Sequence, residues 1–187
     1  MKKVSLTAIV LSLFVLSAFT TPVGKLVSKD THISFFSHTS LEDITANNYK
    51  VVSTLDTASG DIVYSVPMQS FEFEKALMQK HYNSSKFLDT KKHPKAKFIG
   101  KITNLGSIDF SKGGTYNAII TGDLDIKGET KPMEVKATIT VKGNQVTLDS
   151  KMNIVLADHG VTFSGGKPST NIAKEVEVTV KSVYISQ

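Results

Sequence analysis

The chain has 187 residues, of which 40% are hydrophobic and 21% charged, with 12 Gly, 5 Pro and a formal net charge of +5. This composition is ordinary for a globular protein and excludes collagen, low-complexity disorder and miniproteins held together by disulfides. The absence of Cys excludes thiolate zinc sites, iron–sulfur clusters and cysteine nucleophiles. All 22 basic residues are Lys, which neutralises phosphate but lacks the planar fork with which Arg reads guanine.

The N-terminal segment has the order of a secretory signal peptide. Residues 1–3 are positively charged, residues 4–19 form an uncharged apolar run, and we expect cleavage after Thr20. A retained N-terminal anchor is the alternative, although the run is short for a membrane span. Without residues 1–20 the chain has 20 Lys against 17 acidic residues, a net charge of +3 that gives little support for nucleic-acid binding. We therefore expect an exported, soluble, periplasmic or secreted protein with a single domain over residues 21–187.

The first half of this domain contains irregular strands and one helix. Alternation of apolar and polar residues predicts strands over Thr31–Phe36, Tyr49–Thr57 and Asp61–Met68. Ser70 is a suitable N-cap for a helix over residues 71–82, which has Glu near its start and Lys near its end, as the helix dipole favours. The apolar stripe of this helix would consist of Phe73, Ala76 and Leu77.

The second half of the domain alternates more clearly. We expect strands over Ala96–Thr103, Thr115–Lys127, Met133–Val141, Val146–Leu156 and Ala173–Ile185. A turn over Lys127–Lys131 would use Gly128 at positive φ, and Gly143-Asn144 indicates a two-residue hairpin. About eight antiparallel strands and one helix predict an all-β protein whose sheet closes into a barrel, because closure removes exposed edges and turns the apolar face inward.

Residues typical of catalytic and metal sites are not grouped. The five His are scattered, without the spacing that places two ligands on one face. Asp123 and Asp125 share a strand face, but it is the polar one. The chain has no Gly-x-Ser-x-Gly elbow and no glycine-rich nucleotide loop, and Phe163–Gly166 is interpreted as an ordinary loop. We therefore expect no enzymatic activity, no metal and no cofactor.

The apolar faces of the strands leave two interpretations open. An eight-stranded barrel either fills its interior with side chains or holds one small ligand. Small residues among large aromatic ones favour a cavity, whereas a packed core remains equally compatible with the pattern. If there is a cavity, the candidate ligand-binding residues are Phe35, Phe71, Phe73, Leu77, Phe98, Tyr116, Ala118, Ile120, Gly122 and Leu124.

A lysine-rich segment, residues 86–101, has two interpretations as well. It contains Lys86, Lys91, Lys92, Lys95, Lys97 and Lys101, with Asp89 as its one acidic residue. Clustered Lys side chains attract anionic lipid headgroups, so the segment is a candidate for peripheral contact with an anionic membrane. An ordinary solvated loop is the alternative.

Several stretches resemble the YceI-like family over about residues 25–185. They are Ile33–Ile44, Leu55–Val63, Phe71–Asn83, Phe87–Asp89, His93–Phe98 and Gly122–Met133. The resemblance implies an extended, lipocalin-like antiparallel barrel with a helix at its side, exported from the cell, that binds long isoprenoid or fatty-acyl chains in its interior. The resemblance implies no catalytic residue. The family usually has an aromatic residue where this chain has His93, and Val where it has Met133.

Two hypotheses for function follow. The first is an exported carrier or reservoir for a polyisoprenoid, such as a quinone or its precursor. The second is a non-enzymatic structural or interaction barrel with a filled core, to which a partner or a membrane docks at residues 86–101. Lipid that can be extracted from the purified protein would distinguish them.

Overall fold

The computed structural model describes residues 24–162 and 173–185 of the chain. The predicted signal peptide and the Phe163–Gly166 loop lie outside these residues. The strands are β1 (Lys25–Ser28), β2 (Asp30–His38), β3 (Asp43–Asn48), β4 (Val52–Asp56), β5 (Asp61–Pro67), β6 (Glu72–Phe73), β7 (Lys95–Ile102), β8 (Gly114–Ile126), β9 (Glu129–Lys142), β10 (Gln145–Val155) and β11 (Glu175–Ile185). The helices are α1 (Ala76–Asn83) and the 3-10 helices η1 (Met68–Ser70), η2 (Leu105–Ser107) and η3 (Leu156–His159). No helix in the described ranges is long and apolar enough to cross a membrane.

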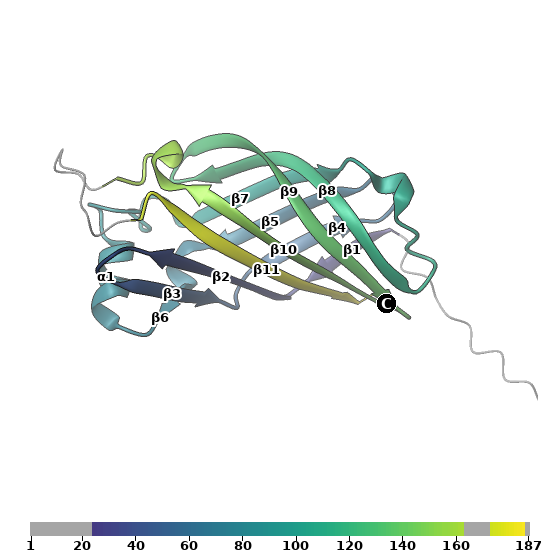
Figure 1. The fold of residues 1–187 in the computed structure, drawn as a ribbon, viewed down its shortest axis with the longest axis horizontal. Helices are drawn as coiled ribbons and strands as arrows, with labels where there is room; N and C mark the ends of the chain where they lie inside the picture. Colours follow the sequence, from purple (N-terminus) through teal and green to yellow (C-terminus); the bar gives the residue numbers. More distant parts are fainter. Residues whose placement is uncertain (1–23, 163–172, 186–187) are drawn as a thin grey trace, which may run out of the picture.

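All strands belong to one curled antiparallel sheet, in the order β1-β4-β5-β7-β8-β9-β10-β11-β2-β3-β6 (Figure 1). A single residue, Lys29, separates β1 from β2, yet β1 pairs with β4 and β2 pairs with β11. The pairs Lys25↔Asp56 and His38↔Asp43 follow the same register, so β1–β2 and β3–β4 form one long bent hairpin. This bent hairpin closes the sheet into a barrel, which confirms the predicted lipocalin-like all-β fold.

The number of strands differs from the expected eight because two of them bend and a short edge strand, β6, is added. If β1–β2 and β3–β4 each count as one continuous strand, they complete a circuit of eight with β5, β7, β8, β9, β10 and β11. The remaining strand, β6, has two residues and pairs with β3 at the edge. Short, interrupted strands carry a weak period-2 pattern, which is why the sequence does not reveal the bends.

The β8–β9 turn is shorter than expected, whereas the β9–β10 turn is as predicted. β8 and β9 are joined by two residues, Lys127 with φ 59° and Gly128 with φ 85°, so β9 begins at Glu129 rather than at Met133. Positive φ at both central positions gives the two-residue turn whose twist matches that of the strands. The predicted Gly143-Asn144 hairpin is confirmed, with Gly143 at φ 59°.

The helix prediction is wrong at its N-terminal end. Residues 71–75 are not helical, Phe73 pairs with Ala46 in the sheet, and α1 begins at Ala76 after Lys75 rather than after Ser70. Ser70 instead ends η1. Because backbone pairing with β3 and burial of Phe71 involve distant residues, they override the local capping signal.

The barrel is closed at its bend by buried hydroxyl groups. Thr31 Oγ1 on β2 lies 3.1, 3.0 and 3.2 Å from the hydroxyl oxygens of Ser28, Ser53 and Ser182. Tyr64 Oη lies 3.2 Å from Ser182 Oγ and accepts a hydrogen bond from Tyr184 at 3.5 Å. These groups join β1, β2, β4, β5 and β11 inside the barrel, where each would be costly to leave unpaired.

Tyr64→Phe is expected to destabilise the protein by about 1–2 kcal/mol, because the hydroxyls of Ser182 and Tyr184 lose a buried partner. Urea unfolding followed by circular dichroism measures the change. Tyr49→Phe is the matched control, since Tyr49 is 55% exposed, and it should change stability by less than about 0.5 kcal/mol. Equal effects of the two substitutions would contradict a stabilising role for the hydroxyl cluster.

Candidate ligand-binding cavity

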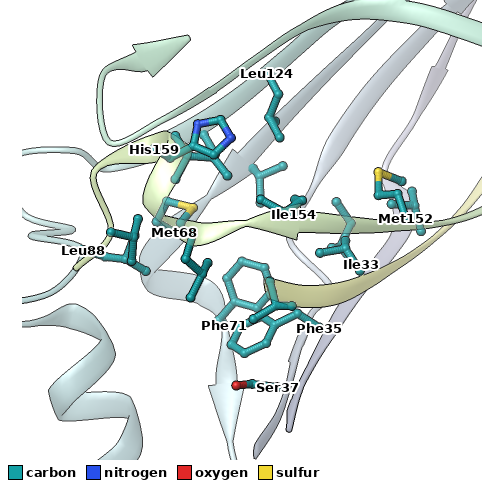
Figure 2. Close-up of a pocket in the computed structure, with 18 of the residues that line it drawn as sticks. Ile33, Phe35, Ser37, Met68, Phe71, Leu88, Leu124, Met152, Ile154 and His159 are labelled. Carbon is teal, nitrogen blue, oxygen red and sulfur yellow. The ribbon is translucent and has the colours of Figure 1, made fainter. Parts of the chain in front are cut away.

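A cavity of about 450 Å³ occupies the end of the barrel that lies beside α1 and η3 (Figure 2). Its walls come from the inward faces of the strands and from α1, η1 and η3. Its volume is in the range of small-molecule binding sites. The opposite end of the barrel is packed by side chains that are fully buried: Leu55, Ile62, Ile102, Ile139, Val146 and Tyr184.

An aromatic cluster forms one wall of the cavity. Phe35 on β2 lies with its ring centroid 5.4 Å from that of Phe71, 5.7 Å from that of Phe73 and 6.0 Å from that of Tyr82 on α1. Phe71 and Phe73 also contact Tyr82, at 5.7 and 5.0 Å. Tilted and edge-on rings at these distances attract one another. The cluster therefore holds α1 against the sheet, and the Tyr82 hydroxyl also donates a hydrogen bond to the Met68 Sδ of η1 at 3.9 Å.

Tyr64 contributes to the inner part of the lining, where it meets the hydroxyl cluster. Burial raises the pKa of the Tyr64 hydroxyl well above its usual value, and the neighbouring Tyr184 raises it further. Burial likewise raises the pKa of Tyr82, which also lines the cavity. Both groups therefore stay uncharged at physiological pH, and the interior offers no phenolate to a ligand.

Few polar groups line the cavity in the described part of the chain. Glu42 follows the β2–β3 turn, and its carboxylate pairs with the Lys75 ammonium at 2.6 Å. Ser37 and Ser150 contribute hydroxyls, and His81 and His159 contribute imidazoles. With one carboxylate, already paired, and no Lys in the lining, the site favours an uncharged ligand.

Six of the ten candidate residues line the cavity: Phe35, Phe71, Phe73, Phe98, Ile120 and Leu124. The other four do not. Leu77 lies on the outer face of α1 and is 59% exposed. The Tyr116 hydroxyl donates to the Lys112 carbonyl at 2.9 Å, on the surface. Ala118 is buried opposite Ala137 in the packed part of the core.

Gly122 does not provide the space that its missing side chain suggests. It pairs with Gly100 across β7 and β8, and the Phe98 ring lies over both glycines. A Cβ built on Gly122 would lie 2.8 Å from the Phe98 Cζ and 2.3 Å from the Ile99 carbonyl oxygen. The ring thus occupies the room at the glycines, an arrangement by which aromatic side chains stabilise glycine-containing strands.

Much of the cavity lining was not predicted from the sequence. The strands that carry it alternate as predicted, so inward-facing Ile33, Met133, Met152, Ile154 and Val178 were identifiable as core but not as cavity. Leu88 and His159 come from a turn and a short helix, where periodicity carries no signal, whereas Met68 was the last residue of the predicted strand Asp61–Met68 and lies in η1. Their position depends on how these segments cover the end of the barrel.

The lysine-rich segment is only partly a loop. Lys95, Lys97 and Lys101 lie on the outward face of β7, and Lys91 and Lys92 lie in the preceding turn, all exposed. Lys101 lies 3.7 Å from Asp61, an exposed ion pair of little energetic weight. None of these lysines lines the cavity. In the described ranges, no group of three or more His, Asp or Glu could hold a metal ion.

Comparison with known proteins agrees with this architecture. Residues 25–184 match the YceI-like domain. The chain belongs to the YceI-like family. Its curated relatives include a UPF0312 protein of Pseudomonas putida (strain W619), 28% identical over 165 residues that cover 83% of this chain and 78% of the relative.

Solved structures with the YceI-like fold superpose on most of the chain. BcnA of Burkholderia cenocepacia has a TM-score of 0.70 at 21% identity, covering 82% of this chain and 95% of its own. A polyisoprenoid binding domain from Saccharophagus degradans, implicated in plant cell wall breakdown, has a TM-score of 0.74 at 11% identity, covering 88% and 99%. At these identities the likeness establishes the fold.

Proposed function

We propose that this protein binds a polyisoprenoid or another long apolar chain inside its barrel, as an exported carrier or reservoir. The observation that carries the proposal is the cavity of about 450 Å³, whose lining is apolar apart from a few hydroxyls, two imidazoles and the Glu42 carboxylate, which is paired with Lys75. Such a cavity binds apolar ligands, because each methylene moved out of water gains about 0.8 kcal/mol. The fold shared with a polyisoprenoid binding domain supports the same ligand class.

The cavity also bears on the alternative function. A barrel with a filled core was the basis of the structural or interaction hypothesis, and an apolar space of this size argues against it. Binding without chemistry is the simpler role, since the described lining groups no catalytic pair of carboxylates and no metal ligands. The apolar run in residues 4–19, after two Lys, supports export to the periplasm.

The protein purified from its own host is expected to contain an apolar lipid that organic solvent extracts in a constant molar ratio. Mass spectrometry of the extract identifies the lipid, and intact-mass measurement of the same sample detects removal of about 20 N-terminal residues. The protein denatured and refolded without lipid serves as the control, and it should take up added polyisoprenoid. Protein that carries no lipid and takes none up would overturn the proposal.

A further inference from the structure

His159 contributes an imidazole to the cavity lining, and in the part of the chain that the structure describes only one of its two ring nitrogens is hydrogen-bonded. His159 is 4% exposed and lines the cavity from η3, on the same side as Met68 and Leu88 (Figure 2). Its Nδ1 lies 2.9 Å from the backbone carbonyl oxygen of Glu129. In the described part of the chain, no hydrogen bond is formed by its Nε2.

The contact between His159 Nδ1 and the Glu129 carbonyl determines whether Nε2 donates or accepts a hydrogen bond. A carbonyl oxygen only accepts, so Nδ1 carries the proton and donates it. In the neutral ring, Nε2 is then an acceptor with a free lone pair. The ring is held in this orientation because η3 is fastened to the β8–β9 turn, where the Lys127 ammonium also donates to the Gly160 carbonyl at 2.9 Å.

We propose that His159 Nε2 accepts a hydrogen bond from a hydroxyl group on the bound chain, so that the cavity selects hydroxylated apolar chains over those that lack a donor. The proposal rests on the proposed function and specifies its ligand class. The described lining contains no Lys, and its one carboxylate, Glu42, is paired with Lys75 outside the lining, so an anionic head group would find no ammonium group in the cavity to bind. A neutral hydroxyl pairs with this acceptor without bringing a charge into the apolar site.

The hydroxyl and the chain occupy different parts of the cavity in this arrangement. His159 lies near the end of the barrel, whereas Tyr64, Leu148 and Val180 line the cavity closer to the packed core. The head group therefore lies beside η3, and the chain extends inward toward Tyr64. Isoprenoid and straight-chain alcohols share this chemistry.

Titration of the lipid-free protein with geranylgeraniol, its methyl ether and the corresponding hydrocarbon tests the proposal. We expect the wild-type protein to bind the alcohol about tenfold more tightly than the ether, which corresponds to the net free energy of one hydrogen bond. His159→Phe keeps a ring of similar shape but removes Nε2, and the preference should fall below about twofold. His81→Phe makes the same change at another lining residue and should retain the preference.

A second measurement needs no substitution. With ¹⁵N-labelled His, the Nε2 resonance of His159 should shift on addition of the alcohol and not on addition of the ether. Equal affinity for alcohol and ether, a preference that survives His159→Phe, or an unchanged Nε2 resonance would overturn the proposal, while binding of the hydrocarbon would leave the proposed function intact. If none of the three compounds binds, the proposed function is wrong as well. A straight-chain alcohol of equal length, titrated in parallel, distinguishes the two sources of the hydroxylated chain.

Discussion

Gly122→Ala is expected to destabilise the barrel by about 3 kcal/mol or more, and much of the protein should be unfolded or insoluble. The added Cβ would lie 2.3 Å from the Ile99 carbonyl oxygen and 2.5 Å from the Gly100 Cα, both backbone atoms of β7. Backbone in a paired strand cannot move aside without breaking the ladder, so the cost lies at the upper end of overpacking substitutions. Chemical denaturation of the soluble fraction measures it.

Gly106→Ala is the matched control for this substitution. A Cβ at Gly106 has no neighbouring atom within 4 Å, and its φ is not positive. The free energy of unfolding should therefore change by less than about 0.5 kcal/mol. If Gly122→Ala behaved like this control, β7 and β8 would not approach each other as closely as the structure shows.

The second large effect compares two phenyl insertions at the same level of the barrel. Ser150 on β10 and Ala118 on β8 both pair with Ala137 of β9, but only Ser150 lines the cavity. Ser150→Phe should project its ring into the cavity and reduce the amount of bound lipid at least about tenfold, with little loss of stability. Ala118→Phe should destabilise the protein by about 1–3 kcal/mol, because its surroundings are already packed.

Thermal unfolding together with mass spectrometry of the solvent extract distinguishes these outcomes. The folded Ala118→Phe protein should retain its lipid, since the cavity is unchanged. A full lipid load in the Ser150→Phe protein would show that the ligand does not occupy this cavity. From the sequence alone, Ala118 was one of the candidate ligand-binding residues, but the structure places Ser150 and not Ala118 in the cavity lining.

The sequence by itself determined the strands of the second half and the inward direction of their apolar residues. Period-2 alternation along β8, β9 and β10 and the turn residue Gly143 are local signals, and a local signal needs no knowledge of the partner strand. The same alternation placed Ile120 and Leu124 on the inner face of β8, where both line the cavity. The number of amphipathic strands predicted the closed barrel, and the family resemblance supplied the ligand class to be tested.

Only the tertiary structure decided where the interior is filled and where it is open. Gly122 has no side chain to fill space, but it lies beneath the Phe98 ring. Leu77 was predicted to face the core, but it faces outward, because Met78, His81 and Tyr82 form the face of α1 that lines the cavity. The position of His159 depends on the packing of η3 against the β8–β9 turn, 30 residues away in the chain. Packing brings together residues that are distant in sequence, so the pattern around one position cannot show whether another side chain already occupies its space.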